Sequence, residues 1–172
     1  ISVNVSPRQF RDPGFIDTVM NALAASGLPP QQLELEITER LILDNTIETA
    51  DILRQLDQSG IRLSVDDFGT GYSALSYLKS YPFDTLKIDK SFVQDVMKEQ
   101  EDASLVKAII NMAHSLGLRV IAEGVEEEAQ THFLQHEGCD YSQGYFYSRP
   151  IPENEFQDWL KTNQRAVRSS TN

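Results

Sequence analysis

Apolar and polar residues alternate with a period of two in six short runs, and this pattern predicts six β-strands. The runs cover Ile1–Ser6, Leu33–Thr38, Arg62–Asp67, Thr85–Asp89, Arg119–Glu123 and Tyr141–Phe146. Apolar residues at helical spacing predict helices over Pro13–Ala25, Asn45–Gln58, Ser73–Ser80, Asp102–Ser115, Glu126–His136 and Glu153–Thr162. Six strand–helix units in succession predict an α/β fold with a parallel sheet covered by helices.

Such a sheet can remain open and doubly wound, or it can curl into a barrel. A complete (β/α)8 barrel has eight strands and about 250 residues. Six strands in 172 residues therefore match the density of a barrel from which two strands are missing. No linker rich in Pro, Gly or Ser divides the chain, so we expect one domain over residues 1–162 and a polar tail over 163–172.

The polar residues of the predicted strands form one set near the strand ends. The set comprises Asn4, Glu36, Asp66, Asp67, Lys87, Glu123 and Gln143. A parallel sheet is covered on both faces, which leaves no solvated face for these groups. In barrels, the carboxyl ends of the strands form the rim where active sites lie. We therefore expect these side chains to converge in one cavity.

Carboxylates and amides are the ligands that hard divalent cations prefer. Several carboxylates in one cavity repel one another strongly unless cations are bound. The adjacent Asp66 and Asp67 can serve two ions, and a two-metal site suits phosphodiester hydrolysis. Lys87 is suited to hold the attacking water or to stabilise charge on the phosphorus centre.

Composition narrows the classes of partner. The formal net charge is −11 and the sequence pI is about 4.6, which argues against binding a nucleic acid polymer or an anionic membrane surface. Cys139 is the single cysteine, so an internal disulfide is excluded and a reducing cytoplasm fits best. No apolar run reaches the roughly 20 residues that span a bilayer. The sequence begins without Met and within an alternating run, so we expect the chain to be part of a longer protein. Other segments of that protein can tether it to a membrane.

Six motifs occur in an order that resembles the EAL domain, the bacterial phosphodiesterase for cyclic di-GMP. The resemblance extends from Ile1 to about Trp159. The motifs are Ser2-Val3-Asn4-Val5-Ser6, Leu35-Glu36-Ile37-Thr38-Glu39, Asp66-Asp67-Phe68-Gly69-Thr70-Gly71-Tyr72-Ser73, Leu86-Lys87-Ile88-Asp89, Ala122-Glu123-Gly124-Val125-Glu126 and Gln143-Gly144-Tyr145-Phe146. The resemblance implies a modified (β/α)8, TIM-like barrel with six of its eight strands in this chain. It also implies hydrolysis of cyclic di-GMP to linear pGpG with two Mg²⁺ or Mn²⁺ ions.

The resemblance assigns metal ligands by position in these motifs. They are Asn4, Glu36, Asp66, Asp67 and Glu123. Asp66 matches the ligand that bridges two ions, and Asp67 matches a ligand of the second ion. Glu123 matches a glutamate that helps to bind the second ion or to activate water.

Further roles follow from the same motifs. Lys87 matches the lysine that contacts the catalytic water, and Glu39 matches a residue that braces the loop after Asp67. Gln143, Asp89 and Glu126 match positions at or beside the bound substrate. The resemblance also implies a homodimer contact in the loop from Phe68 to Leu78 and an upstream regulatory or sensory domain.

One departure from the family pattern stands out. The Glu-Ala-Leu motif, whose glutamate ligates the first metal, and the arginine that follows it are absent from the 172 residues. We therefore expect residues 1–172 alone to be weakly active or inactive, and oligomeric or poorly soluble. The alternative function is a degenerate domain that binds cyclic di-GMP or a protein partner without cleavage.

Three other patterns have simpler interpretations. The sequence Gly69-Thr70-Gly71-Tyr72-Ser73-Ala74 resembles a dinucleotide-binding turn, but Asp66 and Asp67 directly before it would repel a pyrophosphate. His132 and His136 have the spacing of half a zinc site, without an evident third ligand. We interpret these two as surface histidines, and Cys139 as a small packed residue.

Overall fold

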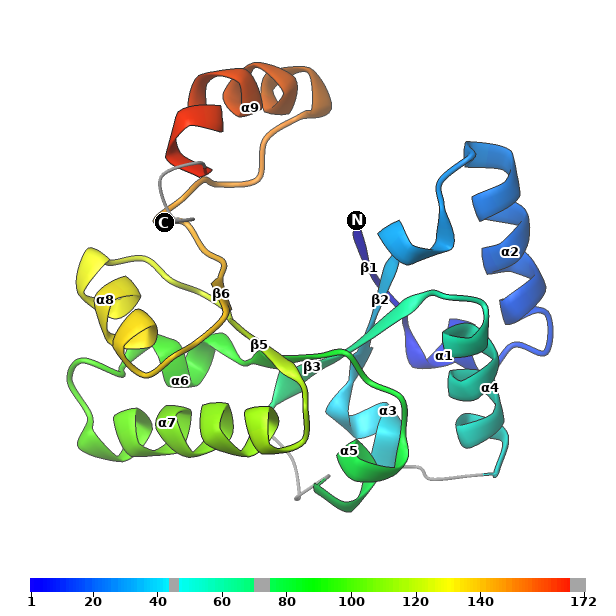
Figure 1. Cartoon of the computed structure of the whole chain (residues 1–172), viewed down its shortest axis with the longest axis horizontal. Helices are drawn as coiled ribbons and strands as arrows, with labels where there is room; N and C mark the ends of the chain where they lie inside the picture. The colour runs from blue at the N-terminus through cyan, green and yellow to red at the C-terminus, as the bar shows by residue number, and fades with distance from the viewer. Residues whose placement is uncertain (44–46, 70–74, 168–172) are drawn as a thin grey trace.

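The computed structural model describes residues 1–43, 47–69 and 75–167, and it contains one curled sheet of six parallel strands (Figure 1). The strands are β1 (Ser2–Asn4), β2 (Glu34–Thr38), β3 (Arg62–Phe68), β4 (Thr85–Ile88), β5 (Arg119–Ala122) and β6 (Tyr141–Ser142). Their order in the sheet is their order in the chain. A doubly wound sheet reverses its strand order at a switch point, so this arrangement is the six-stranded part of a barrel that the resemblance implies.

Helices follow the strands, and most of them cover the outer side of the sheet, whereas the last helix stands apart from it (Figure 1). The six predicted helices are α2 (Phe15–Ser26), α4 (Ile47–Gln58), α5 (Leu75–Ser80), α7 (Gln100–Ser115), α8 (Glu128–His136) and α9 (Glu153–Val167). The pattern did not predict α1 (Pro7–Phe10), α3 (Glu39–Leu43), α6 (Lys90–Gln94) and the 3₁₀ turn η1 (Pro30–Gln32), because elements of three to five residues are too short to show a helical period. Helix α9 continues beyond the expected end at Thr162.

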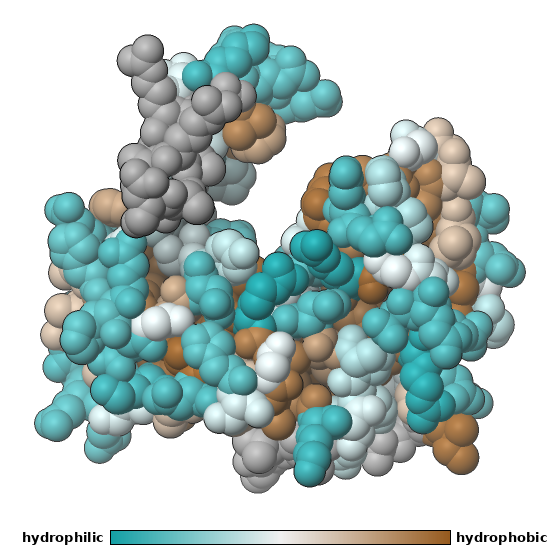
Figure 2. Space-filling model, in the orientation of Figure 1, coloured by the Kyte–Doolittle hydropathy of each residue, from teal (hydrophilic) through white to brown (hydrophobic). Residues whose placement is uncertain are grey.

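The two ends of the described sheet are less regular than predicted. Strand β6 ends at Ser142, four residues before the expected end at Phe146. Strands β1 and β6 each pair with one neighbour within the described part of the chain, which leaves them fewer ladder hydrogen bonds. Apolar side chains are exposed near both edges, on α9 and beside β1 (Figure 2).

The outer face of the sheet packs against the helices through a continuous apolar core. Its strand residues alternate with the polar set, as the period of two requires. Fully buried members from strands and helices include Ile37, Leu53, Leu56, Leu63, Leu86, Ile88, Ile110 and Leu134. Burial of such a side chain contributes about 1.5–3 kcal/mol, so this face supplies most of the apolar stabilisation. None of the helices in the described ranges is long and apolar enough to cross a bilayer.

The register of the strands brings the polar residues to the concave inner face. Asn4 lies beside Glu36 on the first strand pair, and Lys87 lies beside Ile121, two residues before Glu123. Side chains of parallel neighbours in register, and those two residues apart on one strand, point to the same face. The polar positions of several strands therefore share one side of the sheet.

Asp140 fixes the start of β6 to its neighbours. Its carboxylate accepts hydrogen bonds from the backbone N–H of Val120 and from Nε2 of His114, both at 2.8 Å. Partial burial opposes ionisation, but the hydrogen bonds from His114 and Val120 outweigh it and lower the pKa of Asp140.

We expect Asp140→Ala to lower the free energy of unfolding at pH 7 by about 1–3 kcal/mol, because it leaves the Val120 amide without its acceptor. A carboxylate with a lowered folded pKa stabilises above its unfolded pKa of about 3.9, and this stabilisation is lost as the pH falls through the folded pKa. Urea unfolding at pH 7 and at pH 3 measures both effects. Asp158→Ala, which removes an exposed carboxylate paired with Lys161, is the control. Equal destabilisation by the two variants would contradict this role of Asp140.

Candidate metal centre

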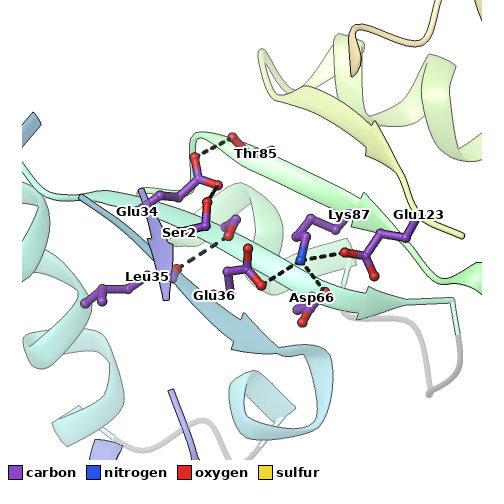
Figure 3. A network of polar contacts seen from close by, with 9 residues as sticks. Ser2, Glu34, Leu35, Glu36, Asp66, Thr85, Lys87 and Glu123 are labelled. Carbon is purple, nitrogen blue, oxygen red and sulfur yellow. Dashed lines mark hydrogen bonds and ion pairs between the residues drawn. The ribbon is translucent and has the colours of Figure 1, made fainter. Parts of the chain in front are cut away.

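The ammonium group of Lys87 lies at the centre of a cluster of carboxylates on the inner face (Figure 3). Nζ is 2.6 Å from Oε2 of Glu36, 2.7 Å from Oε1 of Glu123 and 3.2 Å from Oδ1 of Asp66. The lysine side chain is 4% exposed. Four of the predicted site residues, from four different strands or strand ends, are therefore in direct contact.

The curvature of the sheet makes this convergence possible. Lys87 belongs to β4 and Glu36 to β2, with β3 between them. Adjacent strands lie about 4.8 Å apart, so in a flat sheet these two strands would be roughly twice that distance apart. The long lysine side chain spans the concave face, and Glu123 reaches the same point from the end of β5.

Asp67 joins the cluster through an unusual backbone conformation. Its φ is 55°, the single positive value among the non-glycine residues described, and the register between β3 and β4 shifts between Val65 and Phe68. Consecutive residues of a regular strand point to opposite faces. The shift instead leaves one carboxylate oxygen each of Asp66, Asp67 and Glu123 within 4.8 Å of one another.

The cluster carries more negative than positive charge. Burial disfavours the charged ammonium, but hydrogen bonds to Glu123 and Glu36 outweigh burial and raise the pKa of Lys87. Burial raises the pKa of Glu123 despite its contact with Lys87. Burial and the neighbouring Asp66 likewise raise the pKa of Asp67. The carboxyl groups of Glu36, Asp66, Asp67 and Glu123 thus lie close to a single ammonium group, that of Lys87.

The carboxylates fit a divalent cation. Oδ1 of Asp66 is buried and has no hydrogen-bond partner among the described residues; its 3.2 Å approach to Lys87 is an ion pair. Such a buried anionic oxygen is stabilised further by a cation beyond Lys87, because the ammonium group of Lys87 is shared with Glu36 and Glu123. Together with the nearby oxygens of Asp67 and Glu123, it forms an oxygen donor set of the kind that Mg²⁺, Mn²⁺ and Ca²⁺ prefer.

Two further predicted residues support the strand ends. Oε2 of the buried Glu39 accepts a hydrogen bond of 3.1 Å from the backbone N–H of Gly69, which ties the start of α3 to the chain just after Asp67. Asp89 caps α6 by accepting from the backbone N–H of Ser91 at 2.9 Å. Its hydrogen bond with Asp67 helps to raise the pKa of Asp67, after burial and Asp66.

Gln143 and Glu126 lie beside the cluster, on the wall of a cavity of about 230 Å³ that also includes Glu123. Lys90 and Tyr145 line the same cavity. Sequence reasoning did not select these last two residues, although each directly follows or belongs to a motif that it did select.

Asn4 is the predicted residue that the structure connects least to the site. It is exposed on the edge strand β1, in register with Glu36. No hydrogen bond or ion pair of the described residues joins its side chain to the Lys87 cluster. Its role as a metal ligand stays a prediction.

The loop from Phe68 to Leu78 can be compared with the expected dimer contact only in part, because residues 70–74 lie outside the described residues. Within the described part, Phe68 and Leu78 are buried in the chain's own core. Tyr77 stacks on Tyr81 with ring centroids 6.1 Å apart. The dinucleotide-binding pattern falls mostly on the same undescribed residues.

His132 and His136 are both exposed, as expected of surface histidines. Nδ1 of His136 lies 3.2 Å from Oε1 of Glu137, and the metal-competent group of the described residues is formed by Asp66, Asp67 and Glu123 alone. Burial raises the pKa of the Cys139 thiol to about 11, which suits a packed residue and not a nucleophile.

Comparison with known proteins gives a consistent result. The EAL domain pattern matches residues 1–150. MucR of Pseudomonas aeruginosa, a bifunctional diguanylate cyclase/cyclic di-GMP phosphodiesterase, is 43% identical over 155 residues, which cover 90% of this chain and 23% of MucR. The chain spans between 20% and 23% of the length of the first curated relatives that it matches.

Solved structures agree with this relationship. The cyclic di-GMP complex of the PaMucR phosphodiesterase superposes with a TM-score of 0.87 at 43% identity, over 91% of this chain and 63% of that one. A manganese and cyclic di-GMP complex of Klebsiella pneumoniae BlrP1 superposes with a TM-score of 0.80 at 32% identity, over 87% of this chain and 38% of that one. The six-stranded parallel sheet, the ordered motifs and these matches show that the chain belongs to the EAL domain family.

Proposed function

We propose that the protein hydrolyses one phosphodiester bond of cyclic di-GMP to give linear pGpG, using two divalent cations, Mg²⁺ or Mn²⁺. The observation that carries this proposal is the convergence of Glu36, Asp66 and Glu123 on Lys87, with Asp67 turned toward them. MucR is named as a cyclic di-GMP phosphodiesterase, and its phosphodiesterase has been solved in complex with cyclic di-GMP. The BlrP1 structure is a complex with manganese and cyclic di-GMP.

The residues proposed to hold the cations are Asn4, Glu36, Asp66, Asp67 and Glu123. When bound, divalent cations lower the pKa of water and neutralise charge on the phosphate. We assign Asp66 as the ligand that two ions would share, because it has one carboxylate oxygen within 4.8 Å of oxygens of Asp67 and Glu123. The shifted register and positive φ at Asp67 turn its carboxylate toward the cluster, so that Asp67 can act as a separate ligand although its side chain is short.

The other residues of the site act on water and on the substrate. Lys87 keeps its charge, because three carboxylates surround it, and we assign it to orient the attacking water together with Glu123. Glu39 holds the backbone after Asp67 through Gly69. Gln143 and Glu126, on the cavity wall beside Glu123, are assigned to the substrate, with Asp89 as a further contact.

Asp66→Asn keeps the shape of the side chain but removes the shared anionic charge, so we expect it to lower kcat for cyclic di-GMP by at least about 100-fold. The measurement is pGpG release by the intact protein at saturating Mg²⁺ or Mn²⁺. Glu34→Gln is the matched control. Glu34 lies two residues before Glu36 on the same strand, where it accepts hydrogen bonds from Ser2 and Thr85 instead of Lys87 (Figure 3).

Full turnover in folded Asp66→Asn would reject the proposed site. Tight binding of cyclic di-GMP by the wild type without cleavage would identify the degenerate receptor instead.

We also expect Mn²⁺ to stabilise the folded protein, because a ligand that binds the folded state alone adds about 2.7 kcal/mol at a concentration of 100 times its Kd. Thermal unfolding with and without Mn²⁺ measures this effect independently of turnover. Asp67→Asn should lose much of the increase in Tm, whereas Glu34→Gln should keep it. An equal increase in Asp67→Asn would exclude Asp67 as a ligand.

We propose further that two copies of the protein pair through the segment from residue 68 to 78, and that a regulatory domain precedes the chain. Sedimentation equilibrium of the intact protein should then give the mass of a dimer. Tyr77→Glu, which alters a half-buried residue of this segment, should shift the equilibrium toward monomer. A wild-type protein that sediments as a monomer at high concentration would contradict the pairing.

A further inference from the structure

The amide side chain of Gln130 is buried, 3% exposed, and uses all of its hydrogen-bonding capacity. Its Oε1 accepts from the backbone N–H groups of Glu126 and Glu127 at 2.8 and 2.9 Å. Its Nε2 donates to the backbone carbonyls of Val93 and Gln94, both at 3.2 Å. A primary amide offers two donors and two main acceptor sites, so this group is saturated by four backbone partners.

Gln130 thereby joins two helix ends. The N–H of Glu127, the N-cap of α8, lacks a partner within the helix, and so do the last carbonyls of α6. The acceptor half of the amide forms part of a capping box with Glu127, which is an ordinary local role. The donor half is different, because it reaches residues 36 and 37 positions away in the sequence.

The two segments joined by Gln130 both line the cavity beside the metal centre, and Gly124 of the turn packs directly against Lys90 of α6. Helix α6 contributes Lys90 and Gln94, and the turn that follows β5 contributes Glu123, Gly124 and Glu126. The shape of the cavity on this side therefore depends on how α6 and the turn are held against each other.

The other side of the turn is held against the chain after β6. The backbone N–H of Val125 donates to Gln143 at 3.0 Å, and the carbonyl of Val125 accepts from Phe146 at 3.0 Å. Gly144 lies so close that a Cβ atom there would be 2.0 Å from the carbonyl oxygen of Val125. The turn thus lies between β6 and the donor half of Gln130, and it has little room to move while both contacts hold.

We propose that Gln130 is a positioning residue for the proposed hydrolysis of cyclic di-GMP. It acts through its two bonds to α6, which hold the turn bearing Glu123 and Glu126 at the correct distance from Lys90 and Gln94. The inference rests on the proposed function for its kinetic consequence, whereas its structural consequence can be measured without turnover.

Two substitutions separate positioning from helix capping. Gln130→Glu keeps the oxygen acceptors of the capping box but removes the donors to Val93 and Gln94. Gln130→Met removes both the acceptor oxygen and the donor nitrogen, and its side chain has a similar volume. Thr131→Val is the control, because the Thr131 hydroxyl is buried on the same helix without a hydrogen-bond partner among the described residues.

If the bridge to α6 positions the wall, both Gln130 variants should raise KM for cyclic di-GMP about tenfold, since small misplacements of binding groups have effects of this size or larger. A mere loss of folded protein would lower the apparent kcat and leave KM unchanged. Amide hydrogen exchange in residues 123–127 should be at least about tenfold faster in both variants, because Gln130→Glu loses the two hydrogen bonds to α6 and Gln130→Met loses all four. Thr131→Val should match the wild type in both measurements.

Wild-type KM and wild-type exchange in folded Gln130→Glu would overturn the inference, because the capping box alone would then account for Gln130. A wild-type protein that does not hydrolyse cyclic di-GMP would refute the proposed function. In that case, the exchange rates of Gln130→Glu against Thr131→Val still decide whether the bridge holds the turn.

Discussion

The contact between Lys87 and three carboxylates is the interaction on which the inner face of the sheet depends. A buried charge without partners costs several kcal/mol even after the protein relaxes. Lys87 Nζ has three partners within 3.2 Å, and each carboxylate would in turn lie among like charges without it. The two faces of the sheet are therefore stabilised differently, the outer one by apolar packing and the inner one by a balance of charge.

Much of this arrangement could be predicted from the sequence, because both faces of the sheet are covered. The polar residues that alternate with apolar ones along the strands therefore indicate a site and not a solvated face. The period of two identified all six strands and placed Glu36, Asp66 and Lys87 on one face before any contact was known. The prediction was wrong at the end of β6, where the chain leaves the sheet after Ser142 to follow Val125 instead. The run Tyr141–Phe146 still looks apolar there, but Tyr145 lines the cavity and Phe146 is exposed, so neither belongs to the strand.

Other features lie beyond what such a pattern records. The alternation of side chains would place Asp67 opposite Asp66, and only the backbone, with φ of 55° and a shifted register, turns it toward the cluster. Gln130 and Asp140 were missed for a related reason. A polar residue on a helix or in a loop usually faces solvent, and its backbone partners lie far away in the chain.

The positive φ of Asp67 and the excess of negative charge both destabilise the folded chain at the same place. A strained backbone conformation costs on the order of 1–3 kcal/mol and persists where its surroundings enforce it. Here the strained conformation brings Asp67 close to the carboxylates of Asp66 and Glu123. Burial raises the pKa of both Asp67 and Glu123. Neither the strain nor the added acid favours folding, so both are unfavourable in the absence of a ligand. A bound divalent cation would offset both unfavourable contributions, because it binds deprotonated carboxylates and displaces their protons. At the proposed metal centre, cation binding would therefore be coupled to proton release, and the irregular backbone at Asp67 brings one more carboxylate to the group that could bind the cation.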